Sequence, residues 1–409
     1  MNLTTFSKLE TGISPVFKYF CKERDTVFFL GAGFCADLGL PIMRDFQKAS
    51  LDEYKYLLRE NNKPAVRLFL QSYEFYKDFC TCIRNGQNFI KIDPNNIEDV
   101  FCIAESFVSS GVQALKINEN KWHVEGDIYP HIGFWLWKIY QQCPSLDARK
   151  GKEKQGFIYN DFFSFLKRHM YSNSAIITTN YDLICEYYMK LNGMEITYPI
   201  PTQQFRDIYL LSKKDLYIVD LSFQTFPICK LHGSINYFEQ HSEIKKSDLY
   251  INREWANKGD VIGGSTIPSD RPGMFALDAL SEIKKKMKLG WDVGVIPPTY
   301  SKISNKEWLK YTWNGALTLI SQAKRIIFIG YSFPDSDGFM KAMFQAALSL
   351  KNSGNKLEVY VVDKDGRMKN KFRNLFLTSK VNFFKGTFEE VWAKGNLKRQ
   401  LQGSQRKSG

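Results

Sequence analysis

The sequence predicts an α/β protein with a Rossmann-like, doubly wound parallel sheet and a large helical insertion. Short, continuous apolar runs alternate along the chain with stretches of helical period, which is typical of strands covered on both faces by helices. Several of these runs end directly in glycine, asparagine, histidine or serine. Parallel sheets of this type bind ligands beyond the carboxyl ends of their strands, so the polar ends predict a binding site.

The bulk composition is that of a globular protein. The chain has 409 residues, of which 44% are hydrophobic and 15% aromatic, enough for one large core or two smaller ones. No apolar segment approaches the roughly 18–20 residues that cross a bilayer. The first residues also lack the basic-then-apolar form of a secretory signal. We therefore expect a cytoplasmic protein with no membrane partner.

The cysteines predict neither disulfides nor a metal site. Eight are scattered along the chain, none of them in a CxxC pair and none after Cys229. In a chain of this length, that distribution indicates reduced and mostly buried thiols. We expect no zinc ribbon and no bound metal.

The net charge of +13 raises the question of nucleic-acid binding. Much of the charge is local, in the cluster Lys284–Lys288 and in a basic tail at residues 397–409. Such runs are usually solvated, and a basic surface also attracts an anionic dinucleotide or an acidic partner. Direct nucleic-acid binding is therefore the minority interpretation.

Residues 1–46 are expected to begin the core. A strand at Val27–Leu30 breaks at Gly31-Ala32-Gly33, and a helix start follows. Glycines let backbone amides approach a phosphate, and the dipole of the helix favours its negative charge. Close packing of helix on strand explains the glycines equally well, because the full GxGxxG pattern fails at Ala36.

Residues 47–172 have a helical period and many aromatic residues, so we expect a helical insertion. Asp52–Glu60 and Ala65–Cys82 are amphipathic, Asn96 has the position of an N-cap, and residues 144–155 have the composition of an exposed loop. The aromatic residues are expected to form core, and the insertion to serve as an oligomerisation surface.

Residues 173–396 supply the rest of the predicted core, with a loop-rich insertion at 240–290. The expected strands are Ala175–Thr178, Pro227–Leu231, Val293–Ile296, Arg325–Ile329, Leu357–Val362 and Val381–Phe384. The expected helices are Leu183–Met189, Glu307–Ala323, Phe339–Leu350 and Glu389–Ala393, with one more near 275–288.

Polar residues follow four of these strands. They are Thr179, Asn180 and Asp182; His232; Gly330, Ser332 and Asp337; and Asp363. Asparagine, serine and aspartate also cap helices, and an isolated histidine is usually structural. Their shared placement at the carboxyl ends of strands favours a common site over separate structural roles.

Together these motifs resemble the sirtuin NAD-binding fold. GAGxxxxxGxPxxR begins at Gly31, TxNxD at Thr178, LHG at Leu231 and GxS at Gly330. Four motifs in the family's order, each at the expected strand end, make the resemblance specific. PPT at 297–299 and GYSFPDSD at 330–337 are similar to sirtuin-like domains of bacterial antiphage defence systems.

The resemblance implies NAD as substrate and a role for each matching residue. Asn180 would orient water and the ribose, His232 would be the general base, and Asp182 would bind the nicotinamide carboxamide. The glycine turn and Arg44 would hold the diphosphate, and Ser332 would lie on the adenosine side. The candidate NAD-binding residues are Gly31, Ala32, Gly33, Arg44, Asp45, Thr179, Asp182, Gly330, Ser332, Asp337 and Asp363.

Three departures from the family narrow the expected activity. Cys35 replaces a serine, Ile42 and Met43 replace Asp-Phe, and the four zinc cysteines are missing. In protein-deacylating members the zinc module and its cleft hold the acyl-lysine peptide. We therefore expect an NAD+ hydrolase that releases nicotinamide and ADP-ribose, as an antiphage effector that depletes NAD.

Three alternatives remain open. They are an NAD-dependent protein deacylase, a catalytically silent sensor of NAD or ADP-ribose, and a nucleic-acid-binding protein that uses the basic tail. Uncontrolled NAD hydrolysis would be toxic, so the enzyme is expected to need activation. The expected partners are further copies of the chain in a homo-oligomer and an operon-encoded activator, such as a hexameric ATPase or another sensor subunit.

Overall fold

A computed structural model describes much of the chain. The described residues are 24–42, 45–59, 64–86, 97, 99–100, 103–104, 114–118, 121–124, 135–136, 139–140, 153–199, 225–242, 245–251, 291–295, 307–334, 337–351, 357–377 and 379–405. Arg44, Asn96 and the helix expected near 275–288 lie outside them.

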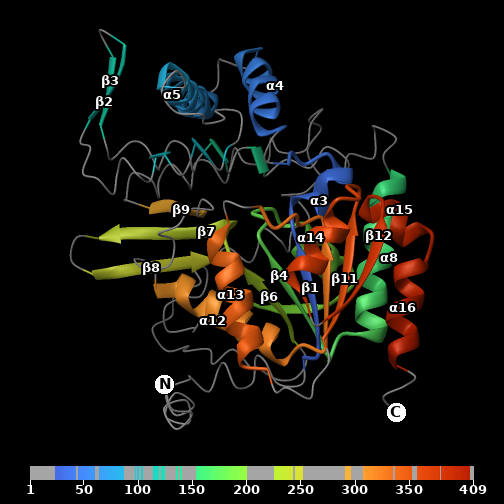
Figure 1. The fold of residues 1–409 in the computed structure, drawn as a ribbon. Coiled ribbons are helices and arrows are strands. Elements are labelled where there is room, and N and C mark those ends of the chain that lie inside the picture. The colour runs from blue at the N-terminus through green and yellow to red at the C-terminus, as the bar shows by residue number, and fades with distance from the viewer. Residues whose placement is uncertain are drawn as a thin grey trace.

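Seven strands form one sheet in the order β12-β11-β10-β1-β4-β6-β5 (Figure 1). Each pairing between neighbours is parallel. From β1 the chain builds one side of the sheet, and it then crosses to the other side of β1 for β10, β11 and β12. This order confirms the predicted doubly wound, Rossmann-like fold. The strands are β1 (Thr26–Leu30), β4 (Ser174–Thr178), β5 (Glu195–Thr197), β6 (Thr225–Lys230), β10 (Arg325–Ile329), β11 (Glu358–Asp363) and β12 (Lys380–Lys385).

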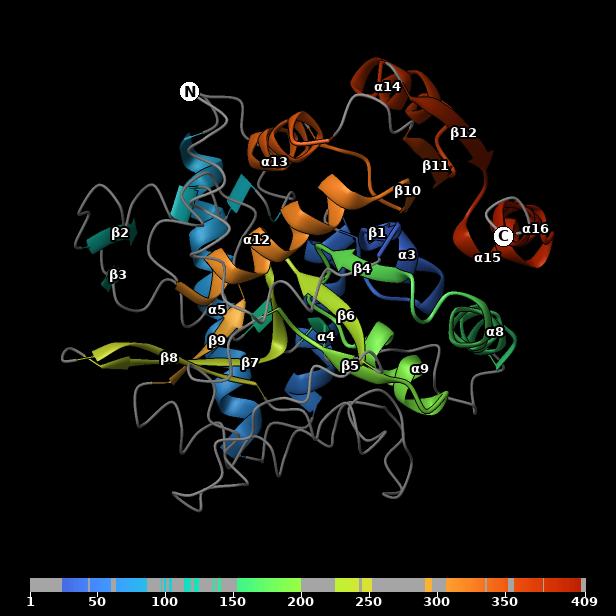
Figure 2. The ribbon, with the colours of Figure 1, turned by 90° about the horizontal axis from the view of Figure 1, so that it is seen from below.

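Helices cover both faces of this sheet. Figure 2 shows α12 (Glu307–Gln322) and α13 (Gly338–Ser349) on one side, and α8 (Glu153–His169) and α16 (Asn396–Gln405) on the other. Successive residues of β1 pack against opposite helical layers. Phe28 packs on Phe162 of α8 with ring centroids 5.6 Å apart, and Phe29 packs on Phe344 of α13 with ring centroids 5.5 Å apart. Burial on both faces explains why the strands are continuously apolar.

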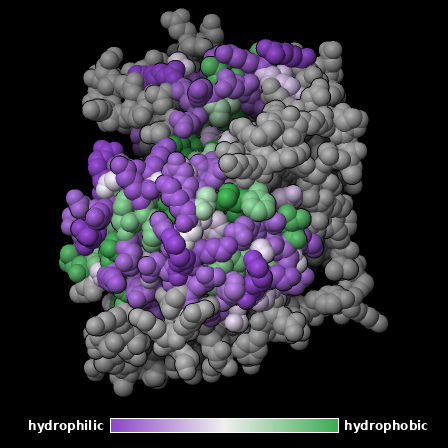
Figure 3. All heavy atoms as spheres, turned by 90° about the vertical axis from the view of Figure 1, so that its right-hand side faces the viewer, coloured by the Kyte–Doolittle hydropathy of each residue, from purple (hydrophilic) through white to green (hydrophobic). Residues whose placement is uncertain are grey.

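The remaining elements extend these layers. Figure 3 shows the outer face over α8, α15 (Phe388–Ala393) and α16 as mostly hydrophilic, with small separate hydrophobic areas among the described residues. No helix in the described part of the chain is long and apolar enough to cross a membrane. The further helices of the core are α3 (Ala32–Cys35), α9 (Ile184–Leu191), α14 (Met368–Leu375) and α15 (Phe388–Ala393).

A second group of elements lies beyond the carboxyl end of the sheet (Figure 1). It contains α4 (Phe46–Arg59), α5 (Pro64–Gly86), and an antiparallel pair of β2 (Ala114–Asn118) and β3 (Lys121–Val124). A separate antiparallel sheet, in the order β8-β7-β9, is formed by β7 (Gly233–Ser242), β8 (Lys245–Ile251) and β9 (Trp291–Val295).

The structure adds elements that periodicity alone does not predict. β7 and β8 enter the segment expected to be irregular from residue 240, and α8 begins at Glu153, inside the expected loop. α16 occupies most of the basic tail, where only Leu397 and Leu401 are buried among the described residues. Two leucines among polar residues are too weak a pattern to predict a helix, and β7 depends on β9, a strand remote in sequence.

The ends of β1 and β10 touch through their backbones. The Gly33 amide donates to the Gly330 carbonyl at 3.0 Å. A Cβ built on Gly330 would lie 2.3 Å from both the carbonyl carbon of Gly33 and the nitrogen of Phe34. Gly330 also has a φ of 64°, which side-chain-bearing residues rarely adopt. Glycines on both strands therefore let the two strand ends meet at the point where the strand order reverses.

This contact predicts a large stability loss for Gly330→Ala. The variant combines an unfavourable left-handed backbone with a steric clash, and we expect the free energy of unfolding to fall by roughly 3 kcal/mol or more. Gly395→Ala is the matched control, because Gly395 has a φ of 68° and a Cβ added there would meet no atom within 4 Å; it should lose about 1–2 kcal/mol. Urea unfolding of both variants measures the difference, and equal losses would contradict the packing argument.

Candidate functional site

A cavity of about 90 Å³ lies at the carboxyl ends of the central strands. It brings together most of the residues that the sequence places in a site. The lining residues are Ala32, Cys35, Leu40, Pro41, Tyr140, Thr179, Asn180, Tyr181, Asp182, His232, Gly330, Tyr331, Ser332, Pro334 and Asp337. The cavity therefore lies where doubly wound sheets bind their ligands.

Four of the described candidate residues do not line the cavity. Asp45 is exposed beside the start of α4. Asp363 ends β11, where its carboxylate accepts a hydrogen bond of 2.7 Å from the amide of Asp365, and burial raises its pKa. Gly31 and Gly33 are also absent from the lining, because their backbones pack against Gly330. Of the glycine turn, only Ala32 reaches the cavity.

The glycine turn differs from the expected phosphate-binding helix end. α3 contains only Ala32–Cys35 and passes into a 3₁₀ turn. The Gly33 amide already donates to Gly330, and the Phe34 amide donates to the Gly31 carbonyl at 2.9 Å. Within the described chain, the Ala32 amide has no backbone acceptor. The turn therefore offers a ligand one amide rather than a row of them.

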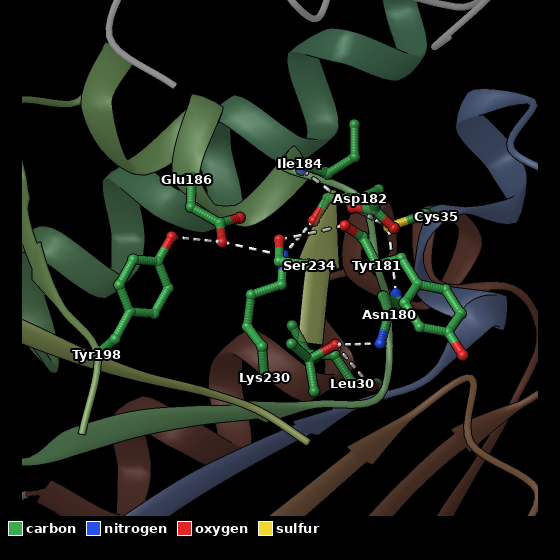
Figure 4. Close-up of polar contacts among 11 residues, drawn as sticks. Leu30, Cys35, Asn180, Tyr181, Asp182, Ile184, Glu186, Tyr198, Lys230 and Ser234 are labelled. Atoms are coloured by element: carbon green, nitrogen blue, oxygen red, sulfur yellow. Dashed lines mark hydrogen bonds and ion pairs between the residues drawn. The ribbon is translucent and has the colours of Figure 1, made fainter. Parts of the chain in front are cut away.

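Asn180 is oriented by the glycine turn. Its Nδ2 donates to the Gly31 carbonyl at 3.0 Å and to the Cys35 sulfur at 3.5 Å, while its backbone amide donates to Thr178 Oγ1 at 3.0 Å. Figure 4 shows the contact with Cys35. Both side-chain N–H groups thus have protein acceptors. The side-chain oxygen Oδ1 is then the atom of the Asn180 amide that can accept a further hydrogen bond.

Asp182 is a buried carboxylate that accepts two hydrogen bonds. Its Oδ1 accepts from the Ile184 amide at 3.0 Å and from the Cys35 thiol at 3.6 Å. Only 5% of the residue is exposed. Burial raises the pKa of Asp182, and the positive charge of Lys230 opposes that rise. The carboxylate is therefore held in an environment that makes its negative charge costly.

His232 is positioned by the turn that follows β6. Gly233 has a φ of 74° there and starts β7. The Leu231 amide donates to the Thr178 carbonyl at 2.9 Å, and the Ile235 amide donates to the Tyr181 carbonyl at 3.0 Å. These bonds tie the turn to the loop after β4, so His232 and Asn180 line the same cavity although they lie far apart in sequence.

The opposite wall is formed by the segment after β10. Ser332 is exposed there, and Phe333 has a φ of 49°, the only positive φ among the described residues other than glycine. The Phe333 ring is buried, with centroid distances of 4.9 Å to Tyr331 and 5.2 Å to Phe344. Tight aromatic packing thus holds a strained backbone beside the cavity.

Asp337 has a structural role in addition to its place in the cavity wall. Its Oδ1 accepts from the Met340 amide at 3.3 Å and caps α13, while its Oδ2 accepts from the Tyr331 hydroxyl at 2.8 Å. Helix capping, considered at the sequence level, is therefore observed for this residue.

Sequence reasoning missed several contributors to the site, of which Tyr140 and Lys230 make notable polar contacts. Tyr140 comes from the insertion, and its hydroxyl donates to the Pro41 carbonyl at 3.2 Å. Lys230 lies beneath the cavity, buried at the end of β6. A lysine that closes an apolar run directly before Leu-His-Gly was a usable signal for Lys230. Tyr140 has no comparable signal, because it is one of many aromatic residues in a helical segment.

Comparison with known proteins gives distant structural similarity only. No family model matches the chain, and no curated protein matches it. Similar solved structures include a Sir2 complex with a p53 peptide and NAD+, at 12% identity and a TM-score of 0.37, covering 98% of this chain and 100% of the other. A structure of Sir2Tm bound to a propionylated peptide has 12% identity and a TM-score of 0.34, with coverage of 98% and 100%.

A third structure, from a study of sirtuin substrate affinity, has 11% identity and a TM-score of 0.36, with coverage of 97% and 99%. At such identities and TM-scores the likeness carries no information about chemistry. Among the described residues, no group of three or more histidine, cysteine, aspartate or glutamate side chains could hold a metal ion.

The burial of Asp182 predicts a pH-dependent stability effect. Its pKa is raised in the folded protein, so its ionisation destabilises the fold as the pH rises from the unfolded pKa, about 3.9, through the folded pKa. Asp182→Asn cannot ionise and keeps an acceptor oxygen. Its stability relative to the wild type should therefore rise with pH, by about 1.4 kcal/mol per unit of pKa shift. Urea unfolding between about pH 4.5 and 8 tests this, and a constant difference would refute it.

Proposed function

We propose that the protein hydrolyses NAD+ at the nicotinamide–ribose bond and releases nicotinamide and ADP-ribose. The observation that supports this most is the meeting of Asn180, Asp182 and His232 in one cavity at the ends of the central strands. Cleavage of such a bond develops positive charge on the sugar, as in glycoside hydrolysis. Nicotinamide leaves as a neutral molecule, so the reaction needs an oriented water and a base more than a strong acid.

Each of the three residues has a role in this proposal. The Asp182 carboxylate accepts hydrogen bonds from the nicotinamide carboxamide, an arrangement that the motif resemblance implies. Asn180 Oδ1 accepts a hydrogen bond from the attacking water or a ribose hydroxyl, since its two N–H groups have protein partners. His232 takes up the proton of the water or ribose hydroxyl, as histidine can near neutral pH.

The size of the cavity bears on regulation. At about 90 Å³, it is smaller than the roughly 300–1,000 Å³ of pockets that hold drug-sized ligands. A dinucleotide therefore requires the cavity to open. The Tyr140 bond to Pro41 joins the insertion to one wall, so movement of the insertion would open that wall.

A closed resting state suits an antiphage effector that depletes NAD only when activated. Under this proposal, the enzyme acts in the cytoplasm. Its cavity opens when the chain assembles into a homo-oligomer or binds an operon-encoded activator, such as a hexameric ATPase or another sensor subunit.

Nicotinamide release from purified protein, with and without the operon neighbour, is the direct test. Release that depends on an acyl-lysine peptide would indicate a deacylase instead, and tight NAD binding without turnover would indicate a sensor.

The proposal predicts the effects of Asn180→Ala and His232→Ala. Each variant should lower the rate of nicotinamide release by roughly 10²–10⁴-fold, the usual loss for a group that handles a proton or water. Chromatographic quantification of nicotinamide and ADP-ribose measures the rate.

Thermal unfolding of the same variants supplies the control for folding. Asn180→Ala also loses the bond to Gly31, which should cost about 1 kcal/mol of stability without unfolding the protein. Near-normal turnover in either folded variant would rule out the assigned role.

A further inference from the structure

A buried ion pair lies next to Asp182, one of the residues that line the cavity (Figure 4). Lys230 Nζ is 3.0 Å from Glu186 Oε1, and the two side chains are 1% and 0% exposed. The Tyr198 hydroxyl donates to the same glutamate oxygen at 3.0 Å. Lys230 belongs to β6 and Glu186 to α9, so the pair joins a strand to a helix beside the site.

Stability does not account for this pair. Removing two charges from water costs about as much as their attraction returns, and well-packed apolar replacements are often neutral or stabilising. The pair is also incompletely satisfied, since Glu186 Oε2 is buried and has no hydrogen-bond partner among the described residues. A buried ion pair that adds little to the stability of the fold and lies at the edge of a candidate site is a candidate for a functional role.

The position of Lys230 connects it to both sides of the site. Its ammonium donates to the backbone carbonyl of Asp182. It also lies on the strand that leads into His232. Glu186, the partner of Lys230, lies in the first turn of the helix that follows Asp182. One buried ammonium thus ties the segment that carries Asp182 to the segment that carries His232.

We propose that Lys230 is a positioning residue for NAD cleavage: it fixes the chain at Asp182 and holds the Asp182 side chain in the anionic form that binds the nicotinamide carboxamide. This inference rests on the proposed NAD hydrolysis. An anionic Asp182 accepts hydrogen bonds from the carboxamide N–H groups. A protonated Asp182 loses acceptor capacity and presents a donor to the same ligand.

The charges around Asp182 make the idea testable. Cys35 of α3 donates to its carboxylate, and Cys185 and Glu186 approach it from α9. Lys230 approaches from β6, and His232 lines the same cavity. Lys230 lowers the pKa of Asp182, whereas Glu186 raises it. Removing one charge or the other should therefore move the titration of Asp182 in opposite directions.

The experiment is the pH dependence of kcat/KM for nicotinamide release, in the assembly in which the wild type is active. On the acidic side, activity falls as Asp182 and the base His232 become protonated, in two ionisations. In Lys230→Met the ionisation of Asp182, and with it the acidic limb, should move to higher pH by about 1–3 units. In Glu186→Gln the ionisation of Asp182 should move to lower pH, and the limb should follow it as far as the ionisation of His232. A merely structural role would lower activity in both variants and leave the limb in place.

Substrate discrimination provides a second readout. Nicotinic acid adenine dinucleotide carries a carboxylate in place of the carboxamide, so an anionic Asp182 repels it. The wild type should prefer NAD+ strongly. In Lys230→Met, at a pH below the shifted limb, the KM for NAD+ should rise more than kcat falls, and the preference for NAD+ over the acid analogue should shrink at least tenfold.

Two further variants keep the test decisive. The double variant Lys230→Met/Glu186→Met replaces the ion pair by apolar side chains and should fold even if the single variants do not. The acidic limb of its pH profile should still move to higher pH, by less than in Lys230→Met. Lys398→Met is the matched control, because Lys398 pairs with Asp161 at 3.0 Å on α16 and α8, where neither residue lines the cavity. Its profile should match that of the wild type.

The outcomes separate this inference from the proposed function. Absence of nicotinamide release by the wild type in every assembly would overturn the proposed function itself. Release by the wild type, with unmoved acidic limbs in the folded Lys230 and Glu186 variants, would overturn only the role of Lys230. Opposite shifts of the two limbs, with reduced discrimination against the acid analogue, would support it.

Discussion

The backbone contact between two glycine turns is the constraint on which the site depends. Gly31 and Gly33 follow β1, Gly330 follows β10, and hypothetical Cβ atoms at these positions would lie 2.3–2.7 Å from the opposing backbone. The doubly wound sheet reverses its strand order between these two strands. The ends of the two strands are in contact there. The cavity is lined by residues of the segments that follow them and of the loops after β4 and β6.

The distribution of polar groups follows from the burial of the sheet. β1, β4 and β10 are buried along their whole length, so their faces cannot accept unpaired charge without a large desolvation cost. Charged and amide side chains therefore gather where the strands end. Asp182, Glu186 and Lys230 are still nearly inaccessible to water, and they remain tolerable because each has hydrogen-bond or ionic partners. Such a cluster favours a specific arrangement of charges more than it favours stability.

The insertion completes the site from outside the sheet. Tyr140 contributes a ring to the cavity wall, and it packs near Phe46 and Tyr181 with centroid distances of 6.0 and 5.7 Å. These contacts connect the segment after the glycine turn, the insertion and the loop after β4. Tyr140 is thus in direct contact with the loop that carries Asn180 and Asp182.

The sequence by itself determined six of the seven strands of the sheet and the polar residues at its edge. It did not predict β5, and the run predicted as a core strand at Val293–Ile296 instead belongs to β9 of the separate antiparallel sheet. Continuous apolar runs predict strands that are buried on both faces, and the residues that follow each strand are given by the sequence. The amino-acid order alone was therefore enough to place Asn180, Asp182 and His232 together at the carboxyl ends of strands. Only the tertiary structure decided that the Gly33 amide is occupied by Gly330, that Asp45 and Asp363 do not line the cavity, and that Tyr140 and Lys230 belong near it. These features depend on pairs of groups remote in sequence, and local periodicity carries no information about which distant segment a side chain will meet.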